Sequence, residues 1–213
     1  MKFNKLPRPF YLRPTVTVAK DLLGKLLVRK LGKKHLIGKI VEVEAYCSDD
    51  PASHSYRGKT KRNQVMFGQG GHLYVYFTYG MHFCSNVVTR EEGTGEAVLI
   101  RAVEPIAGIK TMMRNRSKKK SALLENWSNG VLGSLTNGPA RVCGAFGFGR
   151  KENGFDLLSN EVFIAEGSKP SKINIGTSRR IGIQNGKEKR WRFFIMDNLF
   201  LSRRSVKQRH RTS

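Results

Sequence analysis

Hydrophobic and polar residues alternate along many segments of this chain, a pattern that predicts strands with one buried face. Strands are expected at residues 25–31, 35–46, 73–79, 82–89, 97–103, 162–165, 181–184 and 191–196. Short helices are expected at residues 17–23, 104–114 and 140–146, each beside a terminating glycine or an early proline. Residues 1–15 are expected to form an extended arm and residues 47–71 a long polar loop, and loops of that length are usually functional or mobile.

Length and charge add an expected class of partner to this pattern. The 213 residues suffice for one domain, or at most two small ones. We expect a domain over residues 1–201 and a disordered basic tail over residues 202–213. The chain has 39 Lys and Arg residues against 16 Asp and Glu residues, a net charge of +23. A folded domain this basic most often binds nucleic acid.

An anionic membrane surface is the other candidate partner for so basic a chain. The sequence has no long apolar run and no lipid-anchor motif, so no membrane partner is expected. Its N-terminal residues lack the apolar segment typical of a signal peptide. The lysine-rich run at residues 117–121 is interpreted either as a solvated surface insert or as a loop that contacts phosphates.

The three cysteines do not indicate a metal site. Cys47, Cys84 and Cys143 are odd in number and widely spaced, and no CxxC pair or Cys/His cluster is present. We interpret them as reduced, mostly buried thiols that pack as small hydrophobic residues.

Two carboxylates stand close together on the strand predicted at residues 35–46. Side chains alternate along a strand, so Glu42, Glu44 and Tyr46 share one face and the apolar residues between them share the other. This face is either the solvent side of an amphipathic strand or the site of a general base. Hydrolysis of an N-glycosidic bond needs such a carboxylate, and a second acid nearby would share the work or perturb its titration.

Aromatic residues dominate the strand predicted at residues 73–79. Tyr74 and Tyr76 share one face, and Tyr79 directly precedes Gly80, where the chain is expected to turn. A ring at such a turn either belongs to the core or projects from the surface, where it can wedge into a base stack. Tyr76 is a candidate for stacking on a base, whereas Tyr74 and Phe77 are expected in the core.

Two polar residues interrupt apolar strands farther along the chain. Arg101 lies within the apolar segment 97–103, where a charge is costly unless it is paired. It is expected either to form a structural ion pair with Glu44 or Glu42, or to hold a water molecule and a phosphate. Asn86 is either an ordinary strand residue or a hydrogen-bonding partner for the edge of a base.

Six or more collinear motifs resemble the alkyladenine (3-methyladenine) DNA glycosylases, from about residue 22 to about residue 195. They are EAY at 44–46, His54, TKRN at 60–63, MFG at 66–68, LYVYFTYGMHFCSN at 73–86, LIRAVEP at 99–105, NGP at 137–139, and RIGI at 180–183 followed by WRF at 191–193. The resemblance implies a single mixed α/β (α+β) domain with a curved, mainly antiparallel β-sheet flanked by short helices. Lys61 and Arg179 stand where we expect proline in the family, which puts the geometry of two loops in doubt.

Carried over residue by residue, the resemblance implies roles for ten positions. Glu44 would activate a water molecule and Arg101 would help to hold it. A flipped base would be enclosed by aromatic and imidazole rings, with an amide opposite the 2-amino group of guanine: Tyr46, His54, Tyr76 and Asn86. The residues that would contact DNA beside the lesion are Tyr79, which would intercalate, and Met81, Thr60 and Arg62.

The function implied by the resemblance is monofunctional base excision, in which water rather than a lysine attacks the sugar. The expected partner is double-stranded DNA that contains alkylated or deaminated purines, and the expected state is a monomer without metal or cofactor, in the cytoplasm with the nucleoid or in a nucleus. Two rivals remain. A non-catalytic RNA- or ribosome-binding protein gives Glu44 and Arg101 no task, and a metal-dependent nuclease needs more clustered carboxylates than Glu42 and Glu44.

Overall fold

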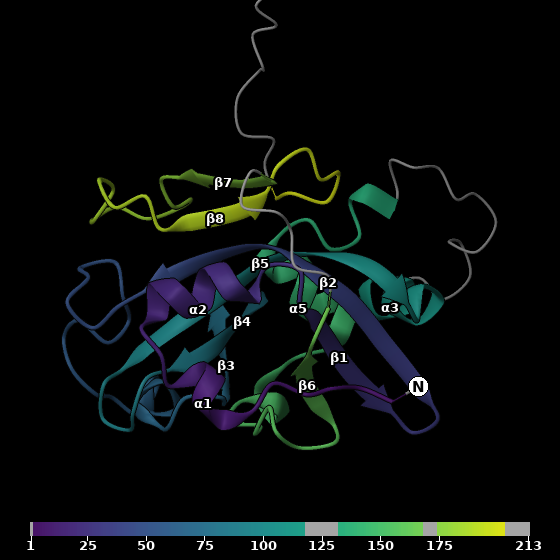
Figure 1. The fold of residues 1–213 in the computed structure, drawn as a ribbon, viewed down its shortest axis with the longest axis horizontal. Coiled ribbons are helices and arrows are strands. Elements are labelled where there is room, and N and C mark those ends of the chain that lie inside the picture. Colours follow the sequence, from purple (N-terminus) through teal and green to yellow (C-terminus); the bar gives the residue numbers. More distant parts are fainter. Residues whose placement is uncertain (1, 118–131, 168–173, 203–213) are drawn as a thin grey trace, which may run out of the picture.

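A curled antiparallel sheet forms the centre of the fold (Figure 1). A computed structural model describes residues 2–117, 132–167 and 174–202. The strands run in the order β3-β4-β5-β2-β1-β6, and β8 pairs with both β2 and β7. Their bounds are β1 Leu26–Leu31, β2 Lys34–Tyr46, β3 Leu73–Thr78, β4 His82–Thr89, β5 Glu96–Ala107, β6 Val162–Ala165, β7 Ile175–Ser178 and β8 Arg192–Ile195. The predicted mixed α/β fold with a curved antiparallel sheet is confirmed.

Short helices pack against this sheet. They are α1 Arg8–Tyr11, α2 Thr15–Leu22, α3 Ile109–Arg116 and α5 Pro139–Phe146, with 3-10 turns η1 Gln64–Phe67 and η2 Arg150–Glu152. The predicted helices at 17–23 and 140–146 are confirmed as α2 and α5. Pro139 begins α5 after Gly138, a position where the missing N–H of proline costs nothing. The predicted extended arm at residues 1–15 is wrong in part, because it contains α1 and the start of α2.

The alternation of side chains gives the sheet two different faces. Val43 and Ala45 of β2 and Val98 and Ile100 of β5 belong to the main core, together with residues of α2 and α5. The opposite face carries a smaller cluster built on Met66, Tyr74, Val88 and Ala97, with Tyr46 and Tyr76 packed against it. The candidate site lies on this second face, so the strands that form the core also hold the functional side chains.

Two predictions about secondary structure are wrong, and one strand was not predicted. No helix begins at Glu104, because β5 continues through Pro105, which pairs with Gly38 of β2 beside a register shift, and α3 begins only after Gly108. No strand forms at residues 181–184. The strand β7 was not predicted, because its sequence, Ile-Gly-Thr-Ser, carries little hydrophobic pattern.

Several other expectations concern single segments. Residues 118–121 of the lysine-rich run and residues 203–213 of the expected tail lie outside the described residues. All three cysteines are free, with Cys84 and Cys143 buried and Cys47 half-buried. No helix within the described parts of the chain is long and apolar enough to cross a membrane.

Candidate active site

A cavity of about 530 Å³ opens on the face of the sheet away from the main core. Its wall contains four tyrosines and an imidazole, with the His54 and Tyr76 ring centroids 4.5 Å apart and nearly perpendicular. Tyr74 and Tyr76 lie side by side at 5.5 Å. The residues that line it come from β2, β3, β4, β5, η1, the start of α5 and three loops: Tyr46, Pro51, Ala52, His54, Met66, Tyr74, Tyr76, Thr78, Tyr79, Asn86, Leu99, Arg101, Pro139, Ile181, Gly182, Ile183, Gln184 and Asn185.

Glu44 is completely buried beside this cavity. Its Oε2 accepts a hydrogen bond from the Tyr46 hydroxyl at 2.8 Å and lies 3.3 Å from Nη1 of Arg101. Its Oε1 accepts the backbone N–H of Ile181 at 2.7 Å. Tyr46 and Arg101, which both contact this carboxylate, line the cavity, so Glu44 lies one side chain away from its wall. The hypothesis of a solvent-exposed carboxylate face at residues 41–46 is wrong.

Glu42 forms the other half of a buried network of charges. Its Oε1 accepts hydrogen bonds from Nε of Arg101 and Nε of Arg192, each at 2.8 Å. Two carboxylates and two guanidinium groups therefore meet in the interior, and their formal charges cancel. A buried carboxylate is costly unless it is paired in this way. The expected ion pair of Arg101 is confirmed, with both Glu42 and Glu44 as partners.

Ser202 closes this network from the C-terminal side. Its backbone N–H and its hydroxyl each donate to Glu42 at 2.6 Å, and its Oγ accepts a hydrogen bond from Nη2 of Arg101 at 3.1 Å. This residue begins the segment that was expected to be a tail. The chain is therefore held to the site through Ser202.

Burial and charge set the protonation of three groups in the wall. Burial, and then the adjacent Glu44 carboxylate, raise the pKa of Tyr46 well above its ordinary value, so its hydroxyl stays a donor. Burial opposes the charge of Arg101, but Glu44 and Glu42 outweigh it and raise its pKa. Desolvation, followed by the charge of Arg62, lowers the pKa of His54. His54 is therefore neutral at physiological pH.

The polar residue predicted to face a base does face the cavity. Asn86 is buried to 5% exposure, lines the cavity and donates from Nδ2 to the carbonyl oxygen of Tyr74 at 3.1 Å. His54 is held by the Tyr74 hydroxyl, 3.1 Å from its Nδ1, and by Asn63, whose Nδ2 donates to the His54 carbonyl oxygen at 2.8 Å. The long loop at residues 47–71 is therefore tied to β3.

Tyr79 and Met81 form an exposed tip at the turn between β3 and β4. Tyr79 is 82% exposed and Met81 71% exposed. Tyr79 has a φ of 51°, an uncommon conformation for a bulky residue that indicates local strain. The core alternative for Tyr79 is wrong. Phe77, which was expected in the core, is 39% exposed, because it lies on β3 beyond the end of the main core.

Thr60 and Arg62 lie outside the wall of the cavity. The hydroxyl and backbone N–H of Thr60 both donate to Oδ1 of Asn63, which caps this part of the loop. Arg62 is exposed and donates from Nη2 to the carbonyl oxygen of Phe77 at 3.3 Å. Both lie on the loop that approaches the β3–β4 hairpin.

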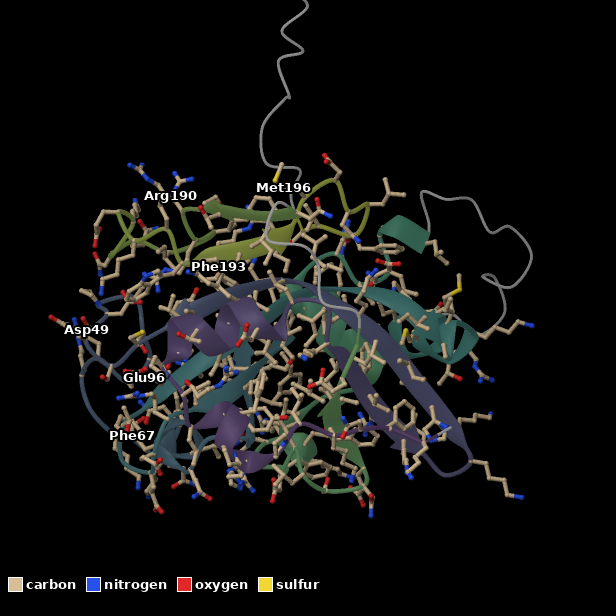
Figure 2. All side chains as sticks on the ribbon, viewed as in Figure 1. Asp49, Phe67, Glu96, Arg190, Phe193 and Met196 are labelled. Carbon is tan, nitrogen blue, oxygen red and sulfur yellow. The ribbon has the colours of Figure 1, made fainter. Side chains whose placement is uncertain are left out.

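The loop between β7 and β8 supplies one wall of the cavity, at residues where a strand was predicted. Figure 2 shows Phe193 of β8 on the side facing α2, within the main core, and Met196 pointing away from the body. Arg180, just before the wall residues, pairs with buried Asp50, donates to the carbonyl oxygen of Ala45 at 3.0 Å, and lies 4.8 Å from the ring centroid of Tyr46. These contacts hold residues 181–185 over β2. In the sequence, the RIGI motif indicated a functional role for this segment, whereas its apolar pattern predicted a strand.

Comparison with known proteins identifies the family to which this chain belongs. A model of the methylpurine-DNA glycosylase family matches residues 9–199. The chain belongs to this family. It is 48% identical over 193 residues to a "Putative 3-methyladenine DNA glycosylase" of Francisella tularensis subsp. tularensis (strain SCHU S4 / Schu 4), covering 89% of this chain and 94% of the relative. Proteins of the same name from Carboxydothermus hydrogenoformans and Alkaliphilus oremlandii are 46% and 45% identical, and the matches cover 93% and 94% of this chain and 99% and 100% of the relatives.

The family gives the coarse chemistry of the site, a DNA glycosylase that acts in DNA repair by excising alkylated bases. The predicted family resemblance is confirmed. Within the described residues there is no group of three or more His, Cys, Asp or Glu side chains that could hold a metal ion. The roles of single residues remain predictions.

Proposed function

We propose that this protein hydrolyses the N-glycosidic bond of alkylated or deaminated purines in double-stranded DNA, as a monomer, after the damaged nucleotide has rotated out of the helix. The observation that carries this proposal is the placement of the buried Glu44–Arg101 pair beside a cavity lined by aromatic rings. A base inside a duplex is inaccessible, so an enzyme that acts on it must extrude it into such a pocket.

The cavity suits a planar, uncharged or cationic ring. Tyr46, His54 and Tyr76 offer faces and edges on which a purine can stack. Neutral His54 does not repel a purine made cationic by alkylation, and the tyrosine rings attract it. Asn86 also lines the cavity, and its proposed role is to meet the edge of the base, which would favour purines without a clashing exocyclic group.

In the proposed reaction Glu44 accepts a proton from a water molecule, and the water oxygen attacks the anomeric carbon of the deoxyribose. The carbon–nitrogen bond breaks, its electron pair leaves with the purine, and an abasic site remains. A cationic alkylated purine leaves as a neutral molecule, whereas a neutral one must gain a proton as it departs. Arg101 and Tyr46 hold the carboxylate of Glu44 in one orientation.

Incubation of lesion-bearing duplex with the protein in EDTA tests this proposal. Free purine should appear before any strand cleavage. Nicking that depends on added metal would indicate a nuclease instead, and tight binding without either product would indicate a non-catalytic nucleic-acid-binding protein. Either result would overturn the proposed hydrolysis.

Substitution of the exposed tip ring should impair recognition without unfolding the protein. Tyr79 is proposed to fill the gap left by the flipped nucleotide, and stacking of one ring on a base contributes about 1–3 kcal/mol. Tyr79→Ala is therefore expected to lower the preference for lesion over undamaged duplex by roughly tenfold in competition binding. Its melting temperature should not fall, because the side chain is exposed.

Tyr56→Ala provides the matched control for this variant. Tyr56 is 51% exposed and lines no part of the cavity, so its loss should leave the preference for lesions intact. Equal discrimination by wild type and Tyr79→Ala would remove Tyr79 from lesion recognition.

A further inference from the structure

A second hollow, of about 760 Å³, lies across the β3–β4 hairpin from the aromatic cavity. It follows the outer edge of β3, the last strand of the sheet. Its residues come from the hairpin, the loop before η1 and the η2 segment: Lys61, Arg62, Val75, Tyr76, Phe77, Thr78, Tyr79, Gly80, Phe83, Arg150 and Asn153. We refer to it as the edge groove.

Two cations of the edge groove are available for a ligand. Lys61 and Arg150 are exposed and, among the described residues, neither forms an ion pair within 4.0 Å. The Arg150 guanidinium lies 5.8 Å from the ring centroid of exposed Phe77. Asn153 fixes the groove on the strand, because its Oδ1 accepts the backbone N–H of Val75 at 2.9 Å. Two positive charges beside an exposed ring can bind the phosphates of a nucleic-acid strand together with a sugar or a base.

We propose that the edge groove binds the DNA strand opposite the damaged nucleotide. Lys61 and Arg150 contact its phosphates, and Phe77 contacts a sugar or the base left without a partner. This inference rests on the proposed function, because the flipped nucleotide defines which strand is the damaged one.

The geometry of the hairpin favours the opposite strand over the damaged one. Tyr76 points to the aromatic cavity, whereas Phe77, the next residue, points to the other face and packs on Phe83 at 5.1 Å between ring centroids. Tyr76, Thr78 and Tyr79 line both hollows, so the end of β3 and its turn lie between them. If Tyr79 inserts into a duplex, one DNA strand lies on each side of its ring. The damaged strand places its flipped nucleotide in the cavity, so the opposite strand is the one that lies next to the edge groove.

The test compares binding of duplex and single-stranded DNA that carries a tetrahydrofuran abasic-site analogue, which offers no base to release. For the double variant Lys61→Gln/Arg150→Gln we expect duplex affinity to fall about tenfold or more. The slope of the logarithm of duplex affinity against the logarithm of salt concentration should become less steep than in wild type, by the amount expected for roughly two lost phosphate contacts. Affinity for the single strand should change by less than about twofold, since that strand does not reach the groove.

Two further variants make the result specific. Lys33→Gln/Lys34→Gln removes the same charge from the β1–β2 turn, away from β3 in the sheet order (Figure 1), and should affect neither DNA form selectively. Phe77→Ser should weaken duplex binding while leaving the salt slope unchanged, because it removes no charge. Equal losses for duplex and single strand, or no loss for either, would overturn the proposal. Because the probe has no base, failure of base release leaves this test unaffected.

Discussion

Replacing Glu44 by glutamine is expected to abolish release of the damaged purine while leaving binding of lesion-bearing DNA mostly intact. The amide keeps the size of the side chain and retains an oxygen that can accept the Ile181 N–H. It lacks the negative charge that faces Arg101 and cannot take a proton from water. A positioned general base contributes on the order of 10²–10⁴-fold to a rate, so single-turnover release should fall by about that factor or more.

The measurement is free purine under single-turnover conditions, together with an equilibrium titration of lesion duplex. Asp49→Asn is the matched control, because Asp49 lies in the loop after β2, its side chain is 77% exposed and it forms a surface ion pair with Lys189. It should release purine at the wild-type rate. Comparable rates for wild type and Glu44→Gln, in protein that is shown to be folded, would remove Glu44 from the mechanism.

Local patterns predicted the strands that carry the site. The period of two placed Glu44 and Tyr46 on one face of β2 and Tyr74 and Tyr76 on one face of β3, and the structure has the same arrangement. The error at Glu104-Pro105 shows where local signals fail. An early proline favours a helix start, but pairing of this segment with β2 extends β5 to Ala107 instead.

Partners distant in sequence could not be predicted in this way. Ile181 is 137 residues from Glu44, Arg192 is 150 residues from Glu42 and Ser202 is 160 residues from Glu42. The apolar alternation at residues 181–184 predicted a strand, but the N–H of Ile181 binds a buried carboxylate rather than a neighbouring strand. A buried charge pattern of this kind depends on the tertiary fold, and hydrophobic periodicity does not encode it.

The buried charges also explain why two acids stand two residues apart on β2. Glu44 faces Arg101 near the cavity, and Glu42 joins Arg101 to Arg192 and Ser202 behind it. Arg101 therefore has a carboxylate on each side and is fixed in one position. Without Glu42, Arg192 would lose the carboxylate that its Nε binds and Arg101 would lose one of its two, which is costly in a low-dielectric interior.

Replacing Glu42 by glutamine is accordingly expected to cause the largest loss of stability. Removing one partner of a fully buried ion pair costs about 3–5 kcal/mol, so the melting temperature should fall on the order of 10 °C. Glu104→Gln is the matched control, because Glu104 pairs with Lys39 but its side chain is 30% exposed. Its loss should cost less than about 1 kcal/mol. Thermal and urea unfolding measure both.

The pH dependence of this stability loss distinguishes the lost charge of Glu42 from a change in packing. Burial alone would raise the pKa of Glu42, but Arg101, Arg192 and Ser202 outweigh it and lower the pKa below the ordinary value of 4.5. Its contribution to stability is therefore complete above that value and is lost as the pH falls through the lowered pKa. The difference in unfolding free energy between wild type and Glu42→Gln should be largest near neutral pH and should disappear in acid. A difference that stays constant with pH would assign the loss to packing. Partial recovery of stability in Glu42→Gln/Arg192→Met would assign it to the buried charge of Arg192.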